Sequence, residues 1–578
     1  MRLKMLTTCL FLQILFITIT IAATPDQPFE LEDADIDSVH TALKTHSLTC
    51  KQLVKAYIAR IEKYNLSINP KPPINAITEI NPSVLDEAQS LDESFTKTNQ
   101  FRGPLHCVPV LIKDNIGAND SSMTSGSFAL LGTQPIHDAF LVSALRKAGA
   151  IILAHTAMDE FAWGAVGISS RNGRVGNAYD TTQNPGGSSA GTGAGISANF
   201  GLVGIGTDNS GSVRIPAAFN GIFGLRPSTG LISQQGLFPM GNLDGTAGPM
   251  TRSVKDMAIL LDVIAVSDPN DSKTQSVPRV KTYTAFLNKN GLQGKRIGIM
   301  RLVGNFDPFK KMPKDTREAL QKSLDKMHEL GATIVDDIRL PKFNNDRKNN
   351  MVGMIDDVNA YLASYPATRK SFHDICESNR TTTFGTQADC IKFIESTPKK
   401  SSKKYKIVLQ TFQQNKQYVE KVMMDNHLDA LIIPISQLGV ATYDMNYINT
   451  FQGSVSSNAG LPSIAMNIGY NNATQMPMGI ELVAKQFNES ILIEIAYSYE
   501  QHTPPRLKPK MPTPNNLYSS YSIAKLNHLY TLIGQNAYQN ALKNRRASED
   551  TNQVLTPDKF NIIVSKTLEE FSSSSTDE

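Results

Sequence analysis

A glycine-rich stretch in the first half of the chain limits the folds open to this protein more than any other feature. It runs from residue 184 to residue 230 and reads NPGGSSAGTGAGISANFGLVGIGTDNSGSVRIPAAFNGIFGLRPSTG. Its first third is crowded with glycine and serine, a composition typical of a flexible linker. The apolar runs at 202–206 and 222–225, however, predict two short buried strands. Glycines in a buried context mark sharp bends or close backbone approaches, so the stretch indicates a compact folded site.

Two serines in this stretch are candidate nucleophiles. Ser188 follows two glycines, and Ser212 follows Gly211. A serine hydroxyl becomes nucleophilic only when a base removes its proton. A glycine-rich turn before the serine can aim successive backbone N–H groups at one spot, which is the design of an oxyanion hole. Taken singly, each serine is more often a turn residue that bonds its own backbone.

The order of these residues resembles the amidase signature family of serine hydrolases. The likeness is carried by GGSSAG followed by GTDNSGSVRIPAAFNGIFGLRPSTG, and the spacing of the two serines matches the family's pair. The resemblance implies that Ser212 is the nucleophile and that Ser188, held in a cis peptide, links it to a lysine. One departure is Ser210, which stands where the family more often has glycine.

A lysine follows a short apolar run outside this stretch, in the sequence VPVLIKDN at 108–115. By itself, Lys113 would be read as a side chain whose stem lies on the core and whose ammonium reaches water. The alternative is a buried amine with a lowered pKa that can take a proton at neutral pH. The family's base lysine stands in this Pro-x-x-x-Lys-Asp context, so the resemblance implies that Lys113 is the base.

The implied reaction is amide hydrolysis through an acyl-enzyme. Neutral Lys113 would draw a proton from Ser188, which would draw one from Ser212 as Ser212 attacks the carbonyl. The oxyanion would be held by backbone N–H groups of Asn209, Ser210 and Gly211. Supporting roles are expected for Ser189, which would brace the site, and for Asp208 and Arg214, which would pair. The polar turn that borders the substrate in the family corresponds here to Thr124, Ser125 and Gly126.

Other kinds of site have less support in the sequence. Asp159 and Glu160 are adjacent, face different ways in a helix and lack a histidine at the spacing of a metal motif, so neither a metal nor another cofactor is expected. The segment Gly187–Gly191 also satisfies G-x-S-x-G, in which Ser189 would be the nucleophile of an α/β-hydrolase-type esterase. Its base would be His427 or His502. A non-catalytic, amidase-like binding protein is a further alternative.

The N-terminus predicts export. Residues 1–23 place Arg2 and Lys4 before an apolar run and end in two alanines, as a secretory signal peptide does. An uncleaved membrane anchor is the alternative. We therefore expect a secreted or periplasmic protein, with membrane contact only if this segment is retained. Four cysteines follow the leader and allow three pairings, of which Cys376 with Cys390, flanking a polar loop, is favoured.

Composition narrows the partners. The formal net charge of +4 is too mild and too evenly spread to indicate nucleic-acid binding. The expected partner is a small-molecule or peptide amide, with peptide amides and aliphatic amides favoured, and a homo-oligomer stays open.

Helices alternating with buried strands predict an α/β fold, and the resemblance implies a central mixed sheet flanked by helices on both faces. The amidase-like domain is expected over 24–503. Residues 344–404 match nothing in the family and are expected to shape the substrate entrance. A C-terminal helical extension with a disordered tail is expected over 504–578, the tail being the polar end from Phe571.

Overall fold

The computed structural model of the 578-residue chain describes residues 29–68, 71–239, 243–345, 351–381, 383–384, 386–436, 454–514, 521–544 and 555–574. The predicted leader at 1–23 lies outside these residues. No helix within the described ranges is both long enough and apolar enough to cross a bilayer.

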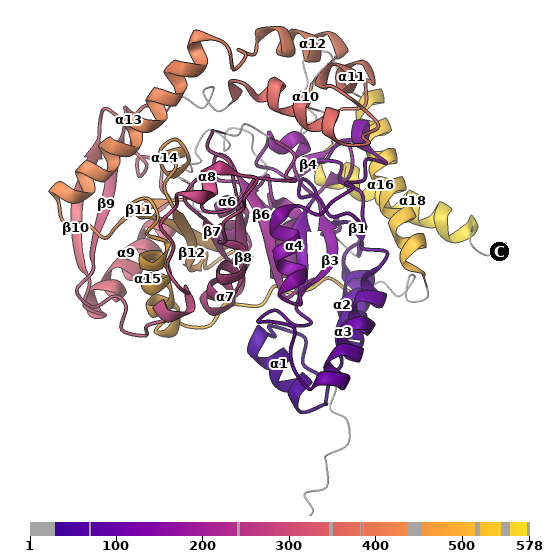
Figure 1. Cartoon of the computed structure of the whole chain (residues 1–578), viewed down its shortest axis with the longest axis horizontal. Helices are drawn as coiled ribbons and strands as arrows, with labels where there is room; N and C mark the ends of the chain where they lie inside the picture. Colours follow the sequence, from indigo (N-terminus) through magenta and orange to yellow (C-terminus); the bar gives the residue numbers. More distant parts are fainter. Residues whose placement is uncertain are drawn as a thin grey trace, which may run out of the picture.

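A mixed sheet forms the centre of the molecule, as predicted (Figure 1). Within the described residues it has eleven strands in the order β1-β3-β2-β6-β8-β7-β12-β13-β11-β9-β10. Strand β2 runs parallel to β3 and β6, whereas β6 runs antiparallel to β8. The strands are β1 Ile77–Ile80, β2 Pro109–Lys113, β3 Ile151–Thr156, β6 Val203–Asp208, β7 Phe223–Arg226, β8 Thr246–Thr251, β9 Arg296–Val303, β10 Thr333–Leu340, β11 Ala430–Pro434, β12 Ser463–Tyr470 and β13 Pro477–Val483. A separate small sheet joins β4 Ile168–Ser169 to β5 Gly173–Arg174.

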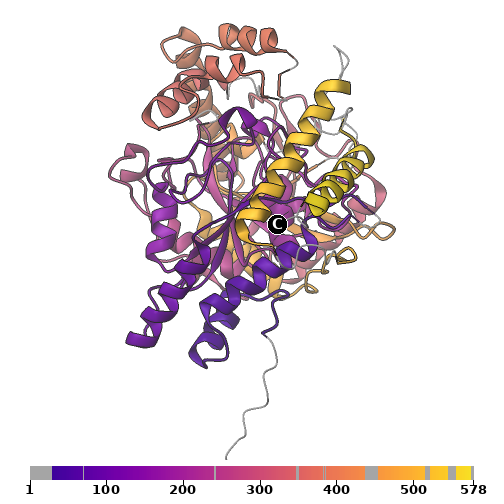
Figure 2. The same cartoon turned by 90° about the vertical axis from the view of Figure 1, so that its right-hand side faces the viewer.

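Helices flank the sheet on both faces (Figure 2). Every residue of β2, β3 and β6 is buried, and strands with no exposed side chain need cover on each face. The helices are α1 Ile36–Lys44, α2 Cys50–Tyr64, α3 Val84–Thr98, α4 Phe140–Lys147, α5 Ala190–Ser197, α6 Arg214–Phe219, α7 Val254–Ile264, α8 Ser272–Gln275, α9 Lys314–Glu329, α10 Met354–Ser364, α11 Phe372–Glu377, α12 Gln387–Ser396, α13 Lys403–Asp425, α14 Ser454–Ser457, α15 Glu489–Gln501, α16 Ile523–Asn544 and α18 Pro557–Ser574.

The C-terminal helices belong to the same core as the sheet. Helix α16 packs against β1 and β5, and its Leu529 and Ile533 are fully buried in the main hydrophobic cluster. The side chain of Asn527 accepts a hydrogen bond from the Ile80 amide and donates one to the Ile80 carbonyl, both at 2.8 Å. These bonds cover the open edge of β1. Helix α18 reaches Ser574, so the polar end that was expected to be disordered from Phe571 is helical up to that residue.

The segment that matches nothing in the family forms a small helical layer of its own. Helices α10, α11 and α12 arch over one side of the sheet (Figure 1). They share a hydrophobic cluster with residues of the main body, among them Phe161 and Phe238. The predicted disulfide between Cys376 and Cys390 joins α11 to α12, with Cα atoms 5.5 Å apart. A second disulfide joins Cys50 of α2 to Cys107, with Cα atoms 5.1 Å apart.

Candidate active site

Strand β2 carries Lys113 into the interior rather than to the surface. The residue is fully buried, and its Nζ lies 2.7 Å from Ser188 Oγ and 2.8 Å from Thr207 Oγ1. Burial lowers the pKa of Lys113 to about 7, although the charges of Asp159 and Asp208 oppose the change. A large fraction of the amine is therefore uncharged at neutral pH, with a lone pair within reach of a serine hydroxyl.

Ser188 lies at the turn that opens α5. The Gly187–Ser188 peptide is cis, and Gly186 before it has φ +75°, a conformation that favours glycine. The next residue, Ser189, has its hydroxyl bonded to the backbone of Thr207, accepting from N–H at 3.3 Å and donating to the carbonyl at 3.2 Å. Ser189 thus braces the turn against β6, the role expected for it.

Ser212 lies in the turn between β6 and α6. The amide of Ser189 donates to the Ser212 carbonyl at 3.1 Å, which ties the two serine turns together. Ser212 is 7% exposed, whereas Ser188 and Lys113 are fully buried. The three residues therefore come together from segments far apart in the chain, and Ser212 is the one nearest the surface. Among the hydrogen bonds of the described residues, none joins the two serine hydroxyls.

The predicted ion pair between Asp208 and Arg214 is present and is part of a larger network. Arg214 Nη2 lies 2.9 Å from Asp208 Oδ1, and Arg214 Nη1 lies 2.5 Å from Glu481 Oε1. Arg226 Nη1 donates to the Asp208 carbonyl at 2.6 Å. Burial raises the pKa of Asp208, but the two guanidinium groups outweigh burial and hold it far below its usual range. The sequence did not indicate Arg226 or Glu481.

The Asp208 carboxylate also shapes the nucleophile turn. It accepts hydrogen bonds from the amide of Gly211 at 2.8 Å and from the amide of Val213 at 3.0 Å. The N–H of Gly211 is thus already donated, which corrects its assignment as an oxyanion donor. The error arose because spacing along the chain does not reveal which way an amide points.

The turn expected to border the substrate is held by Asp114. The Thr124 hydroxyl donates to the Asp114 carboxylate, and the amides of Thr124 and Gly126 donate to it at 3.0 and 3.2 Å. Thr124 is therefore a structural residue of this turn. Ser125 is buried, and its hydroxyl has no hydrogen-bond partner within the described part of the chain. Of the two hydroxyls predicted to meet substrate, only that of Ser125 remains available.

The two adjacent carboxylates at 159 and 160 serve different loops. Asp159 accepts hydrogen bonds from backbone amides at 166–168. Glu160 accepts from the hydroxyls of Thr381 and Thr383 at 2.7 and 2.9 Å, which fastens the inserted layer beside the Ser125 turn. The sequence assigned neither residue a role.

The alternative base residues lie elsewhere. His502 ends α15, where its Nδ1 lies 2.8 Å from the Ser498 carbonyl, and His427 follows α13. The hydrogen bonds of the Ser189 hydroxyl go to Thr207, so neither histidine is placed to activate it. The geometry does not favour the G-x-S-x-G interpretation.

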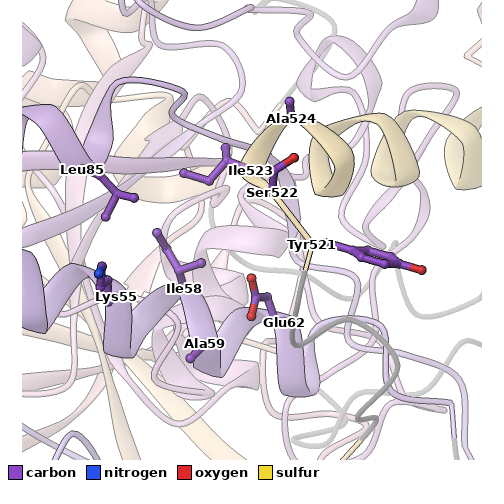
Figure 3. A pocket seen from close by; sticks show the side chains of 9 residues that line it. All are labelled: Lys55, Ile58, Ala59, Glu62, Leu85, Tyr521, Ser522, Ile523 and Ala524. Carbon is purple, nitrogen blue, oxygen red and sulfur yellow. The ribbon is translucent and has the colours of Figure 1, made fainter. Parts of the chain in front are cut away.

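A surface cavity of about 510 Å³ lies apart from this cluster (Figure 3). It opens between α2, Leu85 of α3 and the start of α16. Its walls include Ile58 and Ile523, with Lys55 and Glu62 among the polar side chains. None of the predicted catalytic, oxyanion or substrate residues lines it.

Comparison with known proteins supports the chemistry that the buried amine and the two serines suggest. The sequence model of the family described as Amidase matches residues 52–493. The chain belongs to the amidase family. A protein of Arabidopsis thaliana named "Probable amidase" is 30% identical over 513 residues, which cover 83% of this chain and 92% of that protein.

Relatives and solved structures of this amidase extend the likeness. A glutamyl-tRNA(Gln) amidotransferase protein from Levilactobacillus brevis is 30% identical, over 81% of this chain and 96% of its own length. The native peptide amidase of Stenotrophomonas maltophilia has a TM-score of 0.75 and 31% identity, over 84% of this chain and 100% of that one. An amidase family protein of Bacillus anthracis has a TM-score of 0.74 and 28% identity, over 83% and 93%.

These findings establish the class of reaction. The amidase is a hydrolase that acts on carbon–nitrogen amide bonds by a serine-based mechanism. The non-catalytic alternative and the histidine-dependent alternative are not favoured. The fold, a mixed sheet between helices, is that of the peptide amidase structures.

Proposed function

We propose that Lys113, Ser188 and Ser212 form the proton relay of this amidase. The observation that carries the proposal is the 2.7 Å hydrogen bond between the fully buried Lys113 amine and the Ser188 hydroxyl. A neutral amine at this place can accept the Ser188 proton as Ser188 takes the proton of Ser212. The transfer from Ser212 requires its hydroxyl to approach that of Ser188 more closely than the hydrogen-bonded geometry described above.

In the first half of the reaction, Ser212 Oγ bonds to the amide carbonyl carbon and the carbonyl oxygen becomes an oxyanion. Backbone N–H groups of Asn209, Ser210 and Ser212 are the proposed donors, because the Gly211 N–H is donated to Asp208. Losing one such donor typically costs about 3–4 kcal/mol of transition-state stabilisation. The carbon–nitrogen bond then breaks, and the relay returns its proton to the leaving nitrogen.

In the second half, water replaces the amine. The relay takes a proton from water as the water oxygen attacks the acyl carbon, and the proton is returned to Ser212 when the acid leaves. The Lys113 amine thus ends each half-reaction in the neutral state in which it began.

The proposed substrate is a peptide amide or an aliphatic amide. Support comes from the likeness to the peptide amidase structure at 31% identity over 84% of this chain. Further support comes from the aromatic side chains beside Glu160, where Trp163 lies 5.4 Å from Phe384 and 4.7 Å from Phe393, measured between ring centroids. Apolar surroundings of this kind suit a substrate with a large apolar group.

The proposed location is outside the cytoplasm. The signal-like residues 1–23 and the two disulfides support export, because disulfides persist mainly in oxidising compartments. N-terminal sequencing of the mature protein would separate cleavage after Ala23 from a retained anchor.

Mass spectrometry after treatment with a fluorophosphonate tests the catalytic assignment. We expect an adduct on Ser212 of the wild type, no adduct in Ser212→Ala and strongly slowed labelling in Lys113→Ala. The His427→Gln variant serves as the control and should label as the wild type does. An adduct on Ser189, or full labelling of Ser212→Ala, would refute the assignment. Hydrolysis of a graded panel of peptide and aliphatic amides then tests the substrate class.

A further inference from the structure

Asp159 lies against the proposed relay but has no part in the mechanism described so far. Its amide donates to the Ser188 carbonyl at 3.2 Å. A Cβ atom added to Gly187 would overlap Asp159 Oδ2, so the carboxylate packs directly on the Gly187–Ser188 peptide. Asp159 is 3% exposed, which removes it from the screening effect of bulk water.

The carboxylate is held by backbone amides rather than by cations. Oδ1 accepts hydrogen bonds from Val166 at 3.2 Å and Gly167 at 3.1 Å, and Oδ2 accepts from Gly167 at 3.0 Å. Among the ion pairs of the described residues, none includes Asp159. Hydrogen bonds from amides stabilise a carboxylate without adding a whole positive charge, so its negative charge still acts on its surroundings.

Two carboxylates act on the Lys113 amine, and they differ in this respect. Asp208 is paired with Arg214 at 2.9 Å and with Arg226 at 3.4 Å, which largely offset its charge. Asp159 has no such ion pair within the part of the chain that the structure describes. Its effect on Lys113 ranks ahead of that of Asp208, and both oppose the lowering of the Lys113 pKa by burial.

We propose that Asp159 is a positioning residue of the amidase reaction, which seats the Ser188 peptide and sets the pH at which Lys113 loses its proton. This inference rests on the proposed role of Lys113 as the base. Burial alone would keep the amine neutral but weakly basic, and a poor proton acceptor for a serine hydroxyl. A nearby negative charge favours the ammonium form and makes the amine a stronger base near neutral pH.

The direction of the effect follows from the charges. Burial raises the pKa of Asp159 to about 6, so the carboxylate is mostly ionised when Lys113, with a pKa of about 7, titrates. Asparagine at 159 keeps the size and one acceptor oxygen but removes the charge. The pKa of Lys113 should then fall, and the acid limb of the activity profile should move to lower pH. The charged groups that act on Lys113 are Asp159 and Asp208, and the second is unchanged in this variant.

The experiment measures the rate of fluorophosphonate labelling of Ser212 from about pH 5 to pH 9. In Asp159→Asn we expect the midpoint of the acid limb to fall by about one pH unit, the smallest effect typical of an opposite charge within a few ångströms. Glu160→Gln is the matched control, because it is an equally conservative change of an adjacent buried carboxylate that does not act on Lys113. Its labelling can slow, but its midpoint should remain that of the wild type.

An unchanged midpoint in folded Asp159→Asn would overturn the inference, as would an equal shift in Glu160→Gln. If Asp159→Asn fails to fold, Asp159→Ser replaces it, since the smaller side chain leaves room for water at the amides and also removes the charge. Lys113→Ala separates this inference from the proposed function. Wild-type labelling of Lys113→Ala would refute the relay itself, whereas slow labelling of Lys113→Ala with an unshifted Asp159→Asn would refute only the role of Asp159.

Discussion

Replacing Arg214 by methionine tests the ionic network that holds the nucleophile turn. Arg214 is fully buried and bonds two carboxylates, Asp208 and Glu481, and also the Ser456 hydroxyl. Methionine fills a similar volume with no charge and no donor. The substitution therefore leaves two buried carboxylates that have lost a shared counter-charge, with Arg226 left to bond Asp208.

The magnitude follows from the distances. At an effective dielectric constant of about 20, unit charges 2.9 Å apart, as between Arg214 and Asp208, attract by about 6 kcal/mol before any desolvation cost. Removing the guanidinium also removes its own burial penalty of several kcal/mol, so only part of the attraction is lost. Breaking a buried pair by deleting one partner typically costs about 3–5 kcal/mol. We expect a loss in this range for Arg214→Met.

Urea unfolding at pH 7, followed by circular dichroism and by the fluorescence of Trp163, measures this loss. Arg301→Met is the matched control, because Arg301 makes an equally close pair with Asp336, at 2.6 Å, on the surface. Exposed pairs contribute about 0–1 kcal/mol, so this variant should stay close to the wild type. Losses of equal size in the two variants would refute the argument that burial makes the Arg214 network important. Slower fluorophosphonate labelling of Ser212 should accompany the loss in Arg214→Met alone.

Three more predictions follow from particular contacts. Labelling of wild-type Ser212 should rise with pH through a midpoint near 7, because burial lowers the pKa of Lys113 to about 7 and only the neutral amine accepts a proton. In Lys113→Ala this limb should vanish and kcat/KM should fall about 10²–10⁴-fold, and a persistent limb would contradict the assignment. Gly187→Ala should slow labelling at least about tenfold with a folded circular dichroism spectrum, because the new Cβ overlaps Asp159 and the Ala165 backbone. Asn527→Ala should cost about 1–3 kcal/mol in urea unfolding by exposing the edge of β1, and wild-type stability would show that α16 does not protect that edge.

Local patterns predicted the elements that carry the site. Runs such as PVLIK and the glycine-rich turns before Ser188 and Ser212 specify strands and bends through the residues themselves. The pairing of Asp208 with Arg214 was also within reach, because both residues lie in one turn between β6 and α6. The Cys376–Cys390 pair was favoured for a similar reason, with a sequence separation of 14 between its members.

The errors concern directions and distant partners. The amide of Gly211 turns to Asp208 and the hydroxyl of Thr124 turns to Asp114, so neither faces a substrate as expected. Glu481 lies 267 residues from Arg214, and no local pattern could join them. The polar end from Phe571 continues as helix because α18 packs against α16, a contact that composition does not reveal.

The amino-acid sequence by itself determined which residues could react, because a nucleophile, a base and a flexible turn are properties of side chains and of short stretches of backbone. The tertiary structure alone decided whether they do so. It removed water from Lys113, placed Ser188 within 2.7 Å of the amine and, among the described residues, left Asp159 outside every ion pair. Protonation states depend on burial and on charges a few ångströms away, and in this fold those charges come from residues far apart along the chain.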